Sequence, residues 1–144
     1  QFKQDVISNH KLSKNSKFKY IIISRSKAFK RKLLNEKELL EKLTKYNFKL
    51  IFFEDYNYQE QINIARNCKI MISYHGGGLT NLFFMNSNSL VIEISSKYYN
   101  HKLYKFLSRS LNIKYKSFFC KKSFENLNGI CNANKIVKFI ENII

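Results

Sequence analysis

The chain has 144 residues, which is enough for one domain with a single hydrophobic core. It holds no uncharged apolar run of about 18 residues, the length that a membrane-spanning helix needs. Its formal charge is +16, but only four of its 26 basic residues are arginine, whereas readers of nucleic acid depend on the forked guanidinium. The charge therefore favours anionic ligands in general, including phosphates and acidic membrane surfaces, over specific nucleic-acid recognition.

Cysteines and aspartates are too few for the sites that they usually build. Cys68, Cys120 and Cys131 are too scattered for a zinc site or a disulfide framework. We therefore expect a reducing, cytoplasmic compartment, or the lumen of the Golgi or endoplasmic reticulum if the source is eukaryotic. With Asp5 and Asp55 as the only aspartates, the sequence predicts neither a bound metal nor a cofactor.

The first 17 residues are polar and rich in lysine. Gln1 is not an initiator methionine, and no apolar signal segment follows it. We expect residues 1–17 to continue from an upstream domain, so that the chain starts inside a longer protein.

Five short runs rich in β-branched and aromatic residues predict buried strands. They cover residues 18–24, 49–54, 69–74, 89–94 and 113–119. Helical patterns lie between and after them. Asn35 and Asn57, each followed three residues later by a glutamate, predict two helix starts, and LTNLFFM at 79–85 predicts a short helix. Apolar residues at helical spacing predict two more, through Leu103, Phe106, Leu107 and Leu111, and through Ile136, Val137, Ile140 and Ile144.

Alternation of strands and helices predicts the α/β class: a Rossmann-like, doubly wound parallel sheet of about five strands flanked by helices. No linker or repeat divides the chain, so residues 1–144 are interpreted as one domain. Ligands of such sheets bind beyond the carboxyl ends of the strands. The residues that end each predicted strand are therefore the candidates for function.

Three of the four glycines, Gly76, Gly77 and Gly78, directly follow the third predicted strand. Glycines there allow a sharp turn and close approach of a ligand to the main chain. The N–H groups of the next helical turn, at Leu79, Thr80 and Asn81, would form an anion site suited to phosphate. The alternative is a tight turn that lets the helix pack against its strand.

Glu93 interrupts an otherwise apolar strand near its carboxyl end. A carboxylate is costly to bury unless it is paired or faces a ligand. At this position it could accept two hydrogen bonds from the vicinal diol of a ribose. The alternative is an ion pair with a neighbouring lysine or arginine.

Arg25 and His75 end the first and third predicted strands. In a lysine-rich chain, an arginine at a strand end suggests a forked phosphate contact. His75 could donate to a phosphate or a sugar hydroxyl. We expect Arg25, His75 and Glu93 to surround a single crevice.

Taken together, these motifs resemble glycosyltransferase family 61. The resemblance covers residues 21–94: Ile23-Ser24-Arg25, Asn35-Glu36, Glu60-Gln61, HGGGLTN at 75–81 and VIEI at 91–94. The family more usually has alanine where this chain has Gly77. No P-loop, dinucleotide fingerprint or GxSxG nucleophile motif competes with this assignment.

The resemblance implies one half of an inverting, B-type glycosyltransferase, the C-terminal half that binds the nucleotide sugar. Its partners would be a UDP-sugar donor, a glycan or protein acceptor, and an N-terminal acceptor-binding domain. Arg25, His75 and the glycine run would then face the diphosphate, and Glu93 the ribose or the base. The general base would come from the other half, so no catalytic base is assigned in this chain.

Two other functions remain open from the sequence. One is a non-catalytic nucleotide-binding domain, and the other is a basic nucleic-acid-binding module. The second would bind with a steep dependence on salt and without using Glu93 or the glycines.

Overall fold

A computed structural model describes residues 18–99 and 102–144, so the predicted polar segment at 1–17 lies outside the described residues. Five strands form one parallel sheet in the order β2-β1-β3-β4-β5. The strands are β1 (Tyr20–Ile23), β2 (Phe48–Ile51), β3 (Ile70–Tyr74), β4 (Leu90–Ser95) and β5 (Lys114–Phe119). The predicted α/β fold with a parallel, Rossmann-like sheet is confirmed, and all five predicted strands are present within a few residues.

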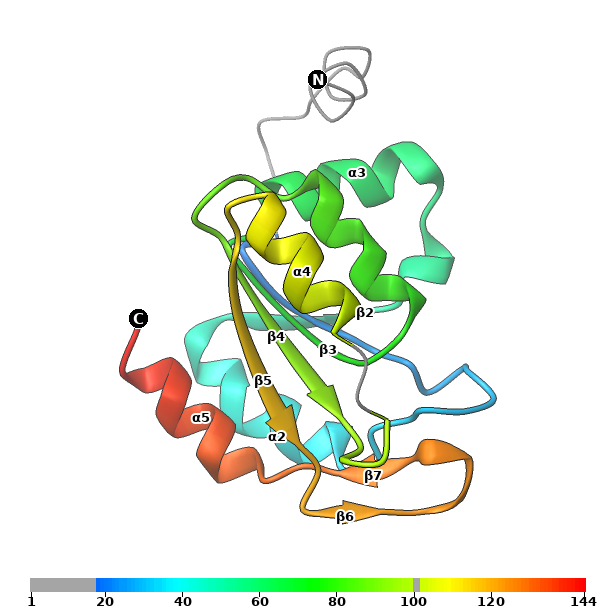
Figure 1. The fold of residues 1–144 in the computed structure, drawn as a ribbon. Helices are drawn as coiled ribbons and strands as arrows, with labels where there is room; N and C mark the ends of the chain where they lie inside the picture. Colours follow the sequence, from blue (N-terminus) through cyan, green and yellow to red (C-terminus); the bar gives the residue numbers. More distant parts are fainter. Residues whose placement is uncertain (1–17, 100–101) are drawn as a thin grey trace.

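Helices cover both faces of this sheet, as Figure 1 shows. One face packs against α2 (Glu36–Leu43) and α5 (Ala133–Glu141), and the other against α3 (Tyr58–Asn67), the 3-10 helix η3 (Gly77–Phe84) and α4 (Leu103–Ser110). Alternate residues of each strand feed the two cores. In β4, Ile92 joins the α2/α5 core and Val91 the other. Burial on both faces explains why β1, β3 and β4 appear in the sequence as largely apolar runs. The predicted burial of β5 is wrong, because β5 lies at an edge of the sheet and Phe118 is its one buried residue.

The strand order places a topological switch point between β1 and β3. The chain passes from β1 to β2 on one side, and then returns across β1 to form β3 on the other. Crossovers that leave neighbouring strands in opposite directions open a crevice at their carboxyl ends, where doubly wound sheets bind ligands. Arg25 follows β1 by two residues, and His75 follows β3 directly.

The segment between β5 and α5 contains a hairpin. Its strands are β6 (Lys122–Ser123) and β7 (Gly129–Ile130), paired antiparallel and joined through the 3-10 turn η4 (Glu125–Leu127). Figure 1 places the hairpin across the end of the sheet to which the strand arrows point. Strands of two residues carry no periodic pattern, which is why the sequence did not predict them.

The predicted caps of the first two helices have different outcomes. The capping box between Asn57 and Glu60 is confirmed. The helix start predicted at Asn35 is confirmed, since α2 begins at Glu36, but the expected side-chain cap bond is absent. The Asn35 side chain instead pairs with the backbone of Cys131, accepting from its N–H and donating to its C=O. Cys131 directly follows β7, and its N–H and C=O both lie alongside the Asn35 side chain. Two hydrogen bonds to Cys131 therefore replace the single cap bond.

The predicted apolar stripe of α4 is wrong at two positions. Leu103 and Phe106 are 58% and 59% exposed, whereas Tyr104 and Ser108 are buried. Tyr104 is drawn inward because its hydroxyl donates to the Gly76 carbonyl at 2.8 Å, so the ring packs apolar atoms while its polar end has a partner. In α5, Ile136 and Ile140 are buried as predicted.

Candidate functional site

Arg25 is held against the glycine run by its own loop. Its Nε donates to the carbonyl of Arg31 at 3.0 Å and its Nη2 to that of Lys30 at 3.3 Å. The guanidinium lies so close to Gly76 that a Cβ at residue 76 would sit 2.0 Å from Nη1. Gly76 has φ 167, an extended conformation open to any residue, so close approach of Arg25 is what requires glycine there.

A second arginine reinforces the positive charge at this point. Burial, and then the nearby charge of Arg31, lower the pKa of Arg25. Arg31 donates to the Tyr99 hydroxyl at 3.4 Å and its guanidinium lies 5.4 Å from the centre of that ring. Within the described residues, no carboxylate lies within 4.0 Å of either guanidinium. The two guanidinium groups lie near each other without a paired carboxylate, so both are available to hydrogen-bond to one anion.

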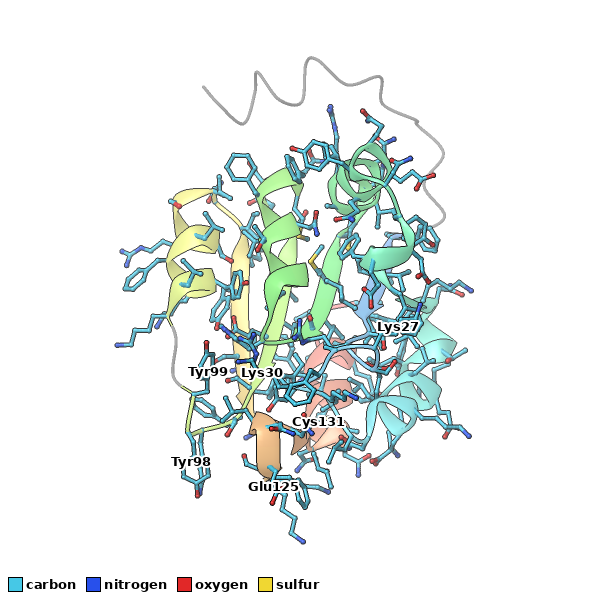
Figure 2. The ribbon with its side chains drawn as sticks, turned by 90° about the vertical axis from the view of Figure 1, so that its right-hand side faces the viewer. Lys27, Lys30, Tyr98, Tyr99, Glu125 and Cys131 are labelled. Atoms are coloured by element: carbon cyan, nitrogen blue, oxygen red, sulfur yellow. The ribbon has the colours of Figure 1, made fainter. Side chains whose placement is uncertain are left out.

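Figure 2 shows where these loops meet. Lys30 and Tyr99, from the loops after β1 and β4, are labelled next to each other, and Tyr98 points away from the protein. The ring of Tyr99 lies 4.8 Å from the ring of His75, measured between centroids, and the ring of Tyr104 lies 5.2 Å from it. Neither tyrosine could be predicted as a site residue, because neither belongs to a motif and both come from a distant segment of the chain.

Glu93 is paired with His75. The two side chains are 2% and 5% exposed, and Nδ1 of His75 lies 2.9 Å from Oε1 of Glu93. The partner is therefore a histidine and not the lysine or arginine considered as the alternative. Pairing becomes possible because β3 and β4 are neighbours with Ser73 opposite Glu93, two residues before His75.

The second oxygen of Glu93 has no hydrogen-bond partner among the described residues. Glu93 lines a cavity of about 340 Å³ between β4, β5 and the start of α4, together with Ser95, Lys102 and Tyr115. Burial, then the nearby charge of Glu93 and a hydrogen-bonding interaction with that carboxylate, raise the pKa of Tyr115, so the Tyr115 hydroxyl is a polar neighbour of Glu93. A buried carboxylate oxygen beside a polar cavity is the feature that a hydroxyl-bearing ligand would use.

The turn after the glycines differs from the predicted helix start. In the 3-10 geometry of η3, the Leu79 N–H donates to the Gly76 carbonyl at 3.0 Å, and the Leu79 side chain is buried. The expectation of a free N–H at Leu79 is therefore wrong, since a 3-10 helix leaves fewer free donors than an α-helix. The N–H groups of Gly77 and Gly78, at the start of the helix, are the better candidates for donors to an anion. Roles for Thr80 and Asn81 in anion binding stay predictions.

The structure brings the predicted residues together as a series of contacts. Arg25 touches Gly76, Gly76 adjoins His75, and His75 pairs with Glu93. Arg25 and Gly78 line a cavity of about 320 Å³ beside Phe53, separate from the one that Glu93 lines. The expected single crevice therefore remains a prediction, while the proximity of its residues is established.

Alanine at Gly76 is expected to weaken anion binding, whereas alanine at Gly77 is expected to have no effect. A methyl group at residue 76 would displace the Arg25 guanidinium, but a Cβ at residue 77 meets nothing within 4 Å. We expect Gly76→Ala to lower UDP affinity about fivefold, the worth of one net hydrogen bond. Calorimetry on both variants tests this, and equal affinities would show that Arg25 does not depend on Gly76.

In the part of the chain that the structure describes, no helix is long and apolar enough to cross a membrane. In the same residues, no group of three or more His, Cys, Asp or Glu side chains is placed to hold a metal ion.

Comparisons with known proteins identify the family. A family model described as Glycosyltransferase 61 matches residues 1–92. The chain is 34% identical over 94 residues to the EGF domain-specific O-linked N-acetylglucosamine transferase of Drosophila melanogaster, covering 61% of this chain and 17% of that protein. It is 33% identical over 102 residues to the protein of the same name from Rattus norvegicus, covering 65% of this chain and 19% of that protein.

The chain thus spans less than a fifth of the length of these relatives. The matched residues contain β1, β3, Arg25, His75 and the glycine run, and end one residue before Glu93. Because the family model covers more than half of the chain, this protein belongs to glycosyltransferase family 61.

Proposed function

We propose that this chain is the nucleotide-sugar-binding half of an inverting glycosyltransferase that uses a UDP-sugar donor. The observation that carries the proposal is the pair of arginines in the loop after β1, of which Arg25 packs against Gly76 and Arg31 lies near Arg25. No carboxylate among the described residues is in salt-bridge contact with either arginine. A diphosphate supplies the missing negative charge.

In the proposed transfer, the acceptor hydroxyl attacks the anomeric carbon of the sugar from the face opposite the diphosphate, which inverts the configuration. Negative charge then grows on the departing diphosphate. Arg25 and Arg31, held in place before the reaction, would stabilise that charge, and the N–H groups of Gly77 and Gly78 would add donors. Deprotonation of the acceptor needs a general base. We assign that role to the other half of the enzyme.

We assign the nucleoside to Glu93. Oε2 of Glu93 would accept from the ribose diol beside the Tyr115 hydroxyl, which also interacts with this carboxylate. His75 contacts the other oxygen and fixes the carboxylate in place. His75 thereby acts on the nucleoside through Glu93, in addition to its predicted place near the diphosphate. No step in this proposal requires a metal ion.

The relatives support a proposal for the class of acceptor. The proteins named above are N-acetylglucosamine transferases specific for EGF domains. We propose that this chain likewise serves transfer to a protein or glycan hydroxyl. A lumenal location, rather than a cytoplasmic one, fits these animal relatives.

UDP is expected to stabilise the chain against thermal unfolding with a chelator present. At about 100 times its dissociation constant, a ligand of the folded state adds about 2.7 kcal/mol to stability. Thermal shift measurements with UDP, GDP, CDP and ADP test this. Absence of a shift with every nucleotide would favour a non-catalytic domain, and a shift only with manganese would contradict metal independence.

A further inference from the structure

The β6–β7 hairpin is hydrogen-bonded to the loop that carries the two arginines. It forms four hydrogen bonds to residues 31–34, which are Arg31 N to Asn126 O (2.9 Å), Lys32 N to Asn128 Oδ1 (2.8 Å), Gly129 N to Lys32 O (3.0 Å) and Leu34 N to Gly129 O (2.8 Å). One of them depends on a side chain, that of Asn128. The loop and the hairpin are about 96 residues apart in the chain, as the Lys32–Asn128 pair illustrates.

The hairpin is also fastened to the end of β3. The Tyr74 hydroxyl donates to the carbonyl of Leu127 at 2.5 Å, and Tyr74 directly precedes His75. Glu125, at the tip of the hairpin in Figure 2, lies below Lys30 in that view. The hairpin therefore contacts both segments that form the site.

The arginine loop and the hairpin both contain residues in backbone conformations that are unfavourable without stabilising contacts. Arg31 has φ 58, and in the hairpin Asn126 and Leu127 each have φ 57, all in the left-handed region that non-glycine residues rarely occupy. Such conformations persist where surrounding contacts hold them. The bonds between loop and hairpin supply those contacts.

The backbone path of the loop after β1 fixes the position of the Arg25 guanidinium. This guanidinium hydrogen-bonds to the carbonyls of Lys30 and Arg31, so a change in the path of these residues moves Arg25. The N–H of Arg31 itself donates the first of the hairpin bonds, to the carbonyl of Asn126. A rigid attachment at residues 31–34 therefore sets the position of both cations.

We propose that the β6–β7 hairpin is a positioning element for the diphosphate site, and that Asn128 is its key positioning residue. This proposal rests on the proposed function, because it concerns how Arg25 and Arg31 are presented to a diphosphate. The hairpin lies beyond residue 92, outside the residues that the family model matches. It acts through the arginine loop without touching the ligand.

The test compares three variants of the 144-residue chain. Asn128→Ala removes the acceptor for the Lys32 N–H, and Asn128→Asp keeps it. Asn132→Ala is the matched control, because Asn132 also accepts from a backbone N–H, that of Lys135, but at the start of α5. Amide hydrogen exchange at residues 31–34 and calorimetry with UDP and uridine are measured on each.

For Asn128→Ala we expect faster exchange at residues 31–34 and about fivefold weaker UDP binding, the equivalent of one hydrogen bond, with uridine binding unchanged. Asn128→Asp and Asn132→Ala are expected to match the wild type at these residues and in UDP binding. If the wild type binds no UDP, the proposed function is overturned. If it binds UDP but Asn128→Ala leaves either exchange or affinity unchanged, the positioning role of the hairpin is overturned alone.

Discussion

Substitution of Arg25 by lysine is expected to weaken UDP binding about tenfold to a hundredfold, as for the loss of a charged, forked hydrogen bond, while uridine binding stays the same. Lysine keeps the charge but loses the planar fork, and with it the bonds that anchor Arg25 to the carbonyls of Lys30 and Arg31. In the proposed complex, the diphosphate is the part of the ligand that faces this fork. Calorimetry with UDP and uridine side by side measures the difference.

Arg109→Lys is the control for this substitution, since Arg109 is an exposed arginine on α4. It should leave the binding of both ligands unchanged. Equal losses of UDP and uridine in Arg25→Lys would mean that Arg25 supports the fold, and the phosphate assignment would be wrong.

Substitution of Glu93 by leucine is expected to lower the free energy of unfolding by about 3 kcal/mol. This value is the upper end of the usual cost of losing one buried hydrogen-bond partner and the lower end of the cost of breaking a buried ion pair. Leucine leaves Nδ1 of His75 buried without its partner. Glutamine keeps an acceptor oxygen near Nδ1, so Glu93→Gln should cost less. Denaturant unfolding of the two variants measures the difference.

The Glu93→Gln variant also tests the nucleoside assignment. Loss of the carboxylate charge should weaken uridine and UDP by the same factor, because both carry the ribose. If Glu93→Gln unfolds like the wild type and binds uridine and UDP as tightly as the wild type, the nucleoside assignment is wrong. Glu93 would then be only a structural partner of His75.

The central strands of the sheet could be predicted from the sequence, because β1, β3 and β4 are buried on both faces. Runs such as Tyr20–Ile23 and Ile70–Tyr74 are therefore apolar apart from Ser73. Functional residues could be predicted at strand ends for the same reason, since the fold class fixes where ligands bind.

The contacts between these residues could not be predicted, because they depend on which strands are neighbours. Arg25 meets Gly76 because β1 lies beside β3, and His75 meets Glu93 because β3 lies beside β4. Local patterns contain no information on this order. The same holds for Asn35, whose local pattern indicates a cap but whose partner, Cys131, is 96 residues away.

The donors after the glycines could not be predicted for a different reason. LTNLFFM has the composition of a helix, but composition does not distinguish α from 3-10 geometry over so few residues. That difference moves the free N–H groups from Leu79 to Gly77 and Gly78.

The central claim is that a nucleoside diphosphate binds at the carboxyl ends of β1, β3 and β4. Titration of the isotopically labelled chain with UDP, followed through its backbone amide resonances, tests this directly. We predict saturable shifts at Arg25, Arg31, Gly77, Gly78 and Glu93, with little change at the opposite ends of the strands. Shifts confined to residues at those opposite ends, such as Lys69 and Lys114, would contradict the claim.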